Sequence, residues 1–276
     1  MKSTCYDIPV GIRTIFVVAQ ECARGERQGW HDLVRDHTFI ARQLFERYFP
    51  TLVPEEENHM VELYRRARAN DNAWFRSFSF SNEREFLMQF RELVFTYGRE
   101  EARVPVPQLS LAQITEIMKG MPLIEREMLW LFIKGYTAGQ MAPIILNAAA
   151  TAEAVKQTAD QRLGEILPGS SPDAFNVSAR VLMEAAETTR GENCLPLKTF
   201  NNLVNGQITW RDREVSEQHI RDCFYCLDRY TSFQEMIRYR KDAVLLTDSQ
   251  TERILAALDL PAAKSKGVLA RFFSKA

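Results

Sequence analysis

The chain has 276 residues, of which 46% are hydrophobic and 26% are charged, as in ordinary soluble globular proteins. Its formal net charge of −1 excludes a global attraction to nucleic acid or to an anionic membrane, so any such binding needs a local patch.

The N-terminal region contains only one short apolar run, IFVVA at residues 15–19, which is too short for a signal-peptide core. No run approaches the ~18–20 apolar residues that a membrane-spanning helix needs. We therefore expect no transmembrane segment and a cytoplasmic location. Thiols stay reduced there, which fits the odd number of five cysteines.

Helical periodicity dominates the chain from its N-terminal third onward. Apolar residues recur three or four positions apart in residues 30–49, 57–69, 83–97 and 109–119. No stretch shows sustained alternation of apolar and polar residues. The sequence therefore predicts an all-α fold.

Proline-rich and glycine-rich stretches divide this helical pattern. Two lie at ARVPVPQL, residues 102–109, and PGSSPDAF, residues 168–175, and a third lies near 258–267. We expect helical domains at 1–103, 108–167 and 174–260, followed by a basic tail at 261–276. The tail is amphipathic and fits either a surface that binds a membrane or partner, or a disordered end.

Residues 121–167 have the pattern of a helix-turn-helix module. An apolar-periodic helix ends at Lys134 and Gly135, Thr137 can cap a short helix, NAAA is expected to form a turn, and Thr151 can cap a last helix.

The same segment resembles region 4 of an extracytoplasmic-function sigma factor, the promoter-reading module of bacterial RNA polymerase. The matching residues are Met121-Pro122, Arg126, Gly135-Tyr136-Thr137 and Gln140-Met141-Ala142. The preceding block is similar to region 2 of that family, with HTFIARQLFERYFP, ENHMVELYRRA and NEREFLMQFRELVFTYGRE at the places of its helices. The resemblance implies contacts with the polymerase core.

The presumed recognition helix is poor in the basic residues that neutralise phosphates and read guanine edges. Residues 151–167 carry only Lys156 and Arg162 as basic residues, against three acidic ones. We therefore expect DNA binding through Lys156 and Arg162 to be weak or absent.

A metal-binding pattern follows in HIRDCFYC, where His219, Cys223 and Cys226 are spaced H-x3-C-x2-C. On one helix these three side chains would share a face. Cys194 is the nearest candidate for a fourth ligand, and a helical hairpin would bring it back beside the other three. Thiolate and imidazole groups are typical zinc ligands. The alternative is that the cysteines are small core residues.

This arrangement resembles the zinc-binding anti-sigma domain over about residues 190–240. The resemblance implies one zinc ion held by Cys194, His219, Cys223 and Cys226, in helices that can wrap a sigma factor. Whether the zinc would be structural or redox-regulatory stays open. Four protein ligands leave no open coordination position, so we expect no enzymatic activity.

Together these patterns predict a transcription regulator that acts by protein–protein contacts. In this hypothesis the zinc-binding module gates an interaction with RNA polymerase core or with a sigma- or anti-sigma-type partner. Two alternatives remain: a non-transcriptional scaffold or adaptor that uses the same modules for assembly, and a working sigma factor that binds promoters directly.

Overall fold

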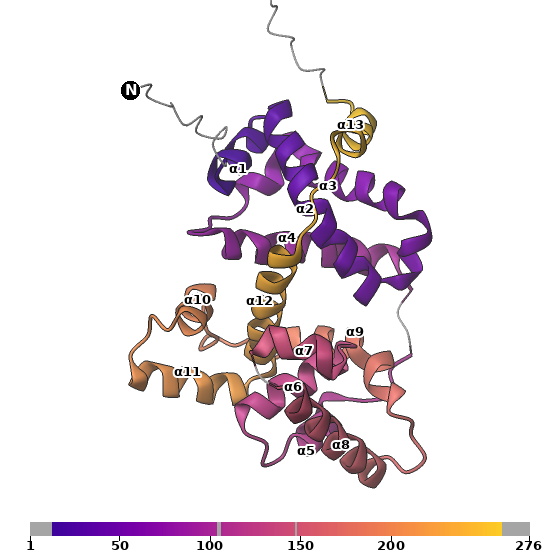
Figure 1. Ribbon diagram of the computed structural model, residues 1–276, viewed down its shortest axis with the longest axis vertical. Coiled ribbons are helices and arrows are strands. Elements are labelled where there is room, and N and C mark those ends of the chain that lie inside the picture. The colour runs from indigo at the N-terminus through magenta and orange to yellow at the C-terminus, as the bar shows by residue number, and fades with distance from the viewer. Residues whose placement is uncertain (1–12, 104–105, 147, 261–276) are drawn as a thin grey trace, which may run out of the picture. The chain divides into compact units, whose positions relative to one another are not determined.

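The computed structural model describes residues 13–103, 106–146 and 148–260 (Figure 1). These residues form thirteen α-helices and one short 3-10 helix, and no strand occurs among them. The all-α prediction is therefore confirmed for this part of the chain. Within it, every helix is too short or too polar to span a lipid bilayer. The predicted basic tail at 261–276 lies outside the described residues.

The helices follow one another with short connections (Figure 1). They are α1 (Ile15–Ala23), α2 (Arg27–Tyr48), η1 (Pro50–Glu55), α3 (Glu56–Arg76), α4 (Glu83–Glu101), α5 (Leu111–Ile117), α6 (Leu123–Ile133), α7 (Ala138–Ile145), α8 (Ala149–Ile166), α9 (Asp173–Thr188), α10 (Leu197–Asn205), α11 (Trp210–Asp222), α12 (Phe224–Asp242) and α13 (Asp248–Ala257).

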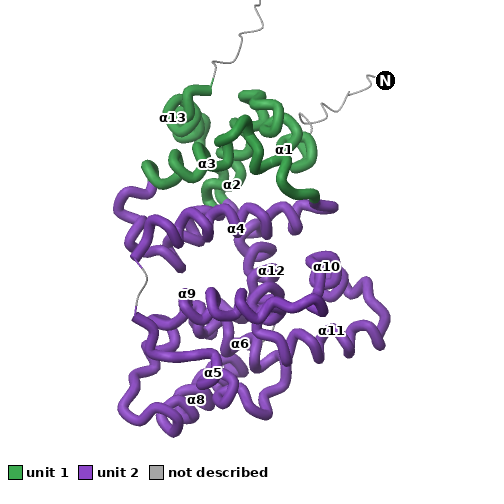
Figure 2. Tube along the Cα trace, turned by 180° about the vertical axis from the view of Figure 1, so that it is seen from behind, with its two compact units in different colours: residues 1–39, 57–79, 244–276 green, residues 40–56, 80–243 purple. Residues whose placement is uncertain are grey.

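The described residues divide into two compact units, each assembled from segments that are distant in the sequence (Figure 2). Unit 1 comprises residues 13–39, 57–79 and 244–260, and unit 2 comprises 40–56 with the described part of 80–243. The predicted domain gap at 104–107 falls between α4 and α5, and the one at 168–173 falls between α8 and α9 except for Asp173, the first residue of α9. The compact units nevertheless combine residues from different predicted domains.

In unit 1, a buried aromatic pair and a buried hydrogen bond join its helices. Trp30 of α2 packs edge-on against Phe75 of α3, with ring centroids 5.3 Å apart. The Tyr64 hydroxyl lies 2.9 Å from that of Thr38. Arg65 of α3 donates to the carbonyl of Ala257 at the end of α13. Arg65 therefore links α3 to the end of α13.

In unit 2, helix α12 is central. It packs against α4, α6, α7 and α9, and the hairpin of α10 and α11 precedes it in the chain. Large apolar side chains of several of these helices are fully buried, including Trp130, Phe90, Phe175 and Phe200. The residues of α12 therefore lie where several segments of the chain meet.

Helix caps account for several helix starts in residues 108–167. Ser110 and Thr137 each form a capping box with the glutamine three positions later, which confirms Thr137 as a cap. The prediction for Thr151 is wrong, because α8 begins at Ala149, with Ala148 as its N-cap. The alanine run that was expected to form a turn enters the helix instead, in line with the high helix propensity of alanine.

Candidate metal centre

Four potential metal ligands from three adjoining segments converge at the start of α12. They are Cys194, His219, Cys223 and Cys226, here called the Cys3His cluster, and their ligand atoms all lie within 4.8 Å of one another. Cys194 precedes α10, and the hairpin of α10 and α11 brings the chain back beside Cys194. The helical hairpin expected between Cys194 and His219 is thus observed.

The backbone around the cluster differs from the single helix that the spacing suggested. His219 lies in the last turn of α11, Cys223 is extended with φ −125° and ψ 113°, and Cys226 lies in the first turn of α12. The expectation that the three side chains share one helical face is therefore wrong. The break at Cys223 starts a new helix, and the sulfur and imidazole groups meet at the corner between the two helices.

Two distances within the cluster are close to those expected around a tetrahedral ion. The Sγ atoms of Cys194 and Cys223 are 3.8 Å apart, and the His219 Nε2 atom lies 3.2 Å from the Cys226 Sγ atom. Two sulfurs bound to zinc at ~2.3 Å in a tetrahedron stand roughly 3.8 Å apart, and a sulfur and a nitrogen roughly 3.6 Å apart. The four cysteines among the described residues are free thiols, so no disulfide competes for these sulfurs.

Backbone amides support two of the sulfurs from outside. The Gly191 amide donates to the Cys194 sulfur at 3.2 Å, and the Leu195 amide donates to the Cys226 sulfur at 3.3 Å. Such contacts orient ligands and stabilise thiolate charge.

Burial opposes the charged state of these thiols. Burial raises the pKa of Cys226, and the neighbouring Cys223 and Cys194 sulfurs raise it further. Burial also raises the pKa of Cys223. Closely spaced thiolates therefore need a nearby positive charge, and a divalent cation supplies it.

The donor set itself indicates a structural site. Three thiolates and one imidazole match the Cys3His sets of structural zinc sites, and all four coordination positions would come from the protein. Cys226 is buried and the other three residues are half-buried, so the centre of the cluster is shielded by protein. The residues present therefore fit a four-coordinate metal ion.

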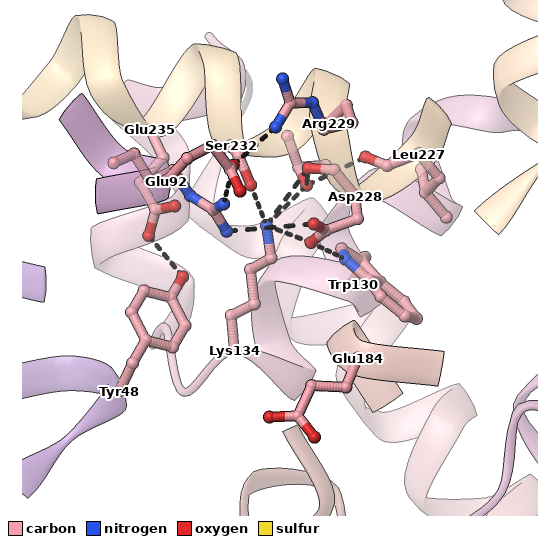
Figure 3. Close-up of polar contacts among 12 residues, drawn as sticks. Tyr48, Glu92, Trp130, Lys134, Glu184, Leu227, Asp228, Arg229, Ser232 and Glu235 are labelled. Atoms are coloured by element: carbon pink, nitrogen blue, oxygen red, sulfur yellow. Dashed lines mark hydrogen bonds and ion pairs between the residues drawn. The ribbon is translucent and has the colours of Figure 1, made fainter. Parts of the chain in front are cut away.

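A network of buried charges begins at Asp228, two residues after Cys226 on α12 (Figure 3). The Asp228 carboxylate accepts a hydrogen bond from the Trp130 indole and forms an ion pair with the Lys134 ammonium, both at 2.9 Å. Lys134 also donates to the hydroxyls of Thr231 and Ser232. Burial alone would raise the pKa of Asp228, but the positive charges of Lys134 and Arg91 outweigh it and lower that pKa.

A second part of the network surrounds Glu235, which lies two turns after Asp228 on α12 and is completely buried. Its Oε1 atom accepts hydrogen bonds from the hydroxyls of Tyr48 at 2.6 Å, Tyr136 and Tyr239. Burial and the adjacent carboxylate raise the pKa of all three phenols, so they remain hydroxyl donors. The Arg47 guanidinium covers the Tyr136 ring at 3.6 Å.

Ion pairs at the edge of the network join α12 to α4. Arg229 pairs with Glu92 at 2.6 Å, and Arg240 pairs with Glu83 at 2.7 Å. On the other side, Arg126 of α6 donates to the carbonyl of Arg221 in the last turn of α11. Helix α12 is thereby bonded to α4, and through Asp228 it is also bonded to Trp130 of α6.

Sequence reasoning missed this network. Lys134 was interpreted as part of a helix stop signal, which it also is, since α6 ends at Ile133. The available signal was an Asp and a Glu seven residues apart in α12, which places them two turns apart on one face.

The two candidate DNA-binding residues of α8 are both engaged within the protein. Arg162 donates to the carbonyls of Ile117 and Lys119, at the end of α5. Lys156 pairs with Asp160 at 3.1 Å and lies over the Phe132 ring. Lys156 is therefore paired with an acid, and Arg162 uses part of its donors within the protein.

Comparison of the chain with protein-family models, with curated proteins and with solved structures finds no match in any of the three.

Proposed function

We propose that this protein is a transcription regulator that acts by protein–protein contacts, with a zinc-binding module that gates its interaction with RNA polymerase core or with a sigma-type partner. The observation that carries the proposal is the position of α12. This helix begins at the Cys3His cluster and is bonded to both helical modules that resemble parts of a sigma factor.

The ion pairs of α12 support a role in which this helix holds the two modules together. Asp228 reaches Lys134 of α6, while Arg229 and Arg240 reach α4. A sigma-like protein needs surfaces of both modules to grip polymerase. A helix that ties the two modules together would restrict that access, and its release would restore it.

Zinc is the metal that the ligand set favours. A bound ion would cross-link the segment before α10, the end of α11 and the start of α12, and so would fix where α12 begins. Because all four ligands come from the protein, the proposed role is structural and not catalytic.

The scarcity of basic residues in α8 favours contacts with protein over contacts with DNA. Both of its basic residues are already bonded to neighbouring groups. A recognition helix with only two basic side chains, one of them paired with an acid, can make few of the phosphate and base contacts on which promoter affinity depends.

Retention of bacterial RNA polymerase core on the tagged full-length chain tests the proposal. The double variant Glu83→Gln with Glu92→Gln removes two of the ion pairs between α4 and α12 and leaves the pair of Arg91 with Asp228. Partly exposed pairs contribute up to about 1 kcal/mol each. We therefore expect roughly 5- to 30-fold more of the open form and more polymerase retained than with the wild type.

The matched control is Glu62→Gln, which removes an exposed ion pair with Arg65 within unit 1. It should leave retention unchanged. If neither the wild type nor the double variant retains polymerase core or a sigma-type protein, the proposal is wrong. Retention of one unrelated protein by both would instead favour the scaffold alternative.

A further inference from the structure

A cavity of about 240 Å³ in unit 2 is lined by positive and apolar groups and by no acid. Its walls come from the end of α2, the start of η1, the segment after α4 and the first half of α9. The lining residues are Arg47, Tyr48, Pro50, Thr51, Arg103, Asn176, Val177, Ala179 and Arg180. We call this cavity the arginine pocket; it shares no residue with the Cys3His cluster.

Three arginines, Arg47, Arg103 and Arg180, line the pocket, and none of them has a paired carboxylate. Among the described residues, no ion pair joins any of them to Asp or Glu. The nearest acid to Arg180 is Glu184, one turn along α9, and its carboxylate is paired with Arg99 at 3.6 Å. The walls of the pocket therefore carry three arginines and no acidic residue.

Arg180 also leaves hydrogen-bond donors unused. Its Nη1 atom donates to the Arg103 carbonyl at 2.8 Å, and its guanidinium lies 4.9 Å from the centre of the Phe49 ring. Its Nε and Nη2 atoms are buried and have no acceptor. A buried donor without an acceptor is costly, and an acidic oxygen in the pocket would satisfy it.

Arg47 is held in position by contacts that leave its charge unneutralised. It donates to the Gly135 carbonyl at 2.8 Å and to the Tyr239 hydroxyl, and it covers the Tyr136 ring. The guanidinium is therefore oriented before any ligand arrives, which lowers the entropy lost on binding.

We propose that the arginine pocket binds the phosphate group of a small phosphomonoester. Three guanidiniums match the charge and the several acceptor oxygens of a phosphate dianion better than those of a single carboxylate. Thr51 and Asn176 add neutral polar groups, and Pro50, Val177 and Ala179 form an apolar wall for the carbon portion. The volume lies below the roughly 300–1,000 Å³ of pockets for drug-sized ligands, which limits that portion to a few carbon atoms.

Calorimetric titration of the full-length protein with inorganic phosphate and with glycerol 3-phosphate tests this proposal, with malonate as the carboxylate comparator. We expect saturable binding of both phosphate compounds at millimolar or lower concentrations, and weaker binding of malonate. Arg180→Gln and Arg103→Gln should each lower phosphate affinity about tenfold or more, because each removes a charge-assisted contact.

Arg238→Gln is the matched control, since Arg238 pairs with Asp242 on α12 and does not line the pocket. It should bind phosphate as the wild type does. Arg103 is exposed, so its variant remains informative if Arg180→Gln fails to fold. The proposal is overturned if phosphate does not bind saturably, if malonate binds more tightly, or if both pocket variants bind like the wild type.

Discussion

Replacing Lys134 by methionine isolates the contribution of the buried network on α12. The ammonium group is fully buried and contacts the Asp228 carboxylate and the Thr231 and Ser232 hydroxyls at 2.9 to 3.0 Å. Methionine retains most of the length and apolar surface of the side chain but removes the charge and the three donors. Asp228 then remains buried, with its main counter-charge gone.

The expected cost is about 3 kcal/mol of unfolding free energy. Loss of one partner from a buried ion pair costs roughly 3–5 kcal/mol. The low end applies here, because the Trp130 indole still donates to Asp228 and the Arg91 guanidinium lies 3.9 Å away. The double variant Lys134→Met with Asp228→Leu should recover much of the loss, since no unpaired charge stays buried.

Urea unfolding followed by far-ultraviolet circular dichroism measures both variants. Lys119→Met serves as the control, because Lys119 is exposed and pairs with Glu116 only at the surface. Its effect should stay within about 0.5 kcal/mol. If Lys134→Met costs less than about 1 kcal/mol, or if the double variant is the less stable of the two, then the network does not stabilise α12 in the way described here.

Two further predictions concern single side chains. Burial raises the pKa of Glu127 from 4.5 to about 7, a shift that the Gln234 hydrogen bond partly offsets. The folded state favours the protonated carboxyl, so the free energy of unfolding of the wild type should fall by about 3 kcal/mol as the pH rises from about 5 to 8. Unfolding curves measured across this range should show no such loss for Glu127→Gln. A pH dependence that is unchanged in the variant would contradict the assignment. Leu146 caps α7 with φ 52° and is 90% exposed. Glycine adopts this left-handed conformation without strain, so Leu146→Gly should raise the free energy of unfolding by about 1 kcal/mol. A destabilised variant would show that the Leu146 side chain packs against the protein.

Much of the fold follows from local sequence pattern. Residues 30–49 carry apolar side chains at helical spacing and lie within α2 and the residue after it, and the glycine at 135 ends α6 with φ 85°. These features depend on neighbouring residues only, so the sequence predicts them well. The corner at Cys223 was not predicted, because nothing in HIRDCFYC signals a break between two helices.

The remainder depends on contacts between residues far apart in the chain. Lys134 and Asp228 are separated by 94 positions, and nothing in the sequence around either one marks it as a buried charge. Periodicity carries no information about which lysine forms an ion pair with which aspartate. The same limit applies to Arg180, whose unused donors become visible only when α2, α9 and the segment after α4 form one cavity.

The most direct test of this account is the metal content of the purified protein, measured beside its urea stability with and without a chelator. We predict about one zinc ion per chain, released by the chelator together with a loss of stability, since binding energy at such a site is folding energy. Cys226→Ala should abolish metal binding, whereas Cys22→Ala, outside the cluster, should keep it. A metal-free wild type that is as stable as the protein supplied with zinc would contradict the account.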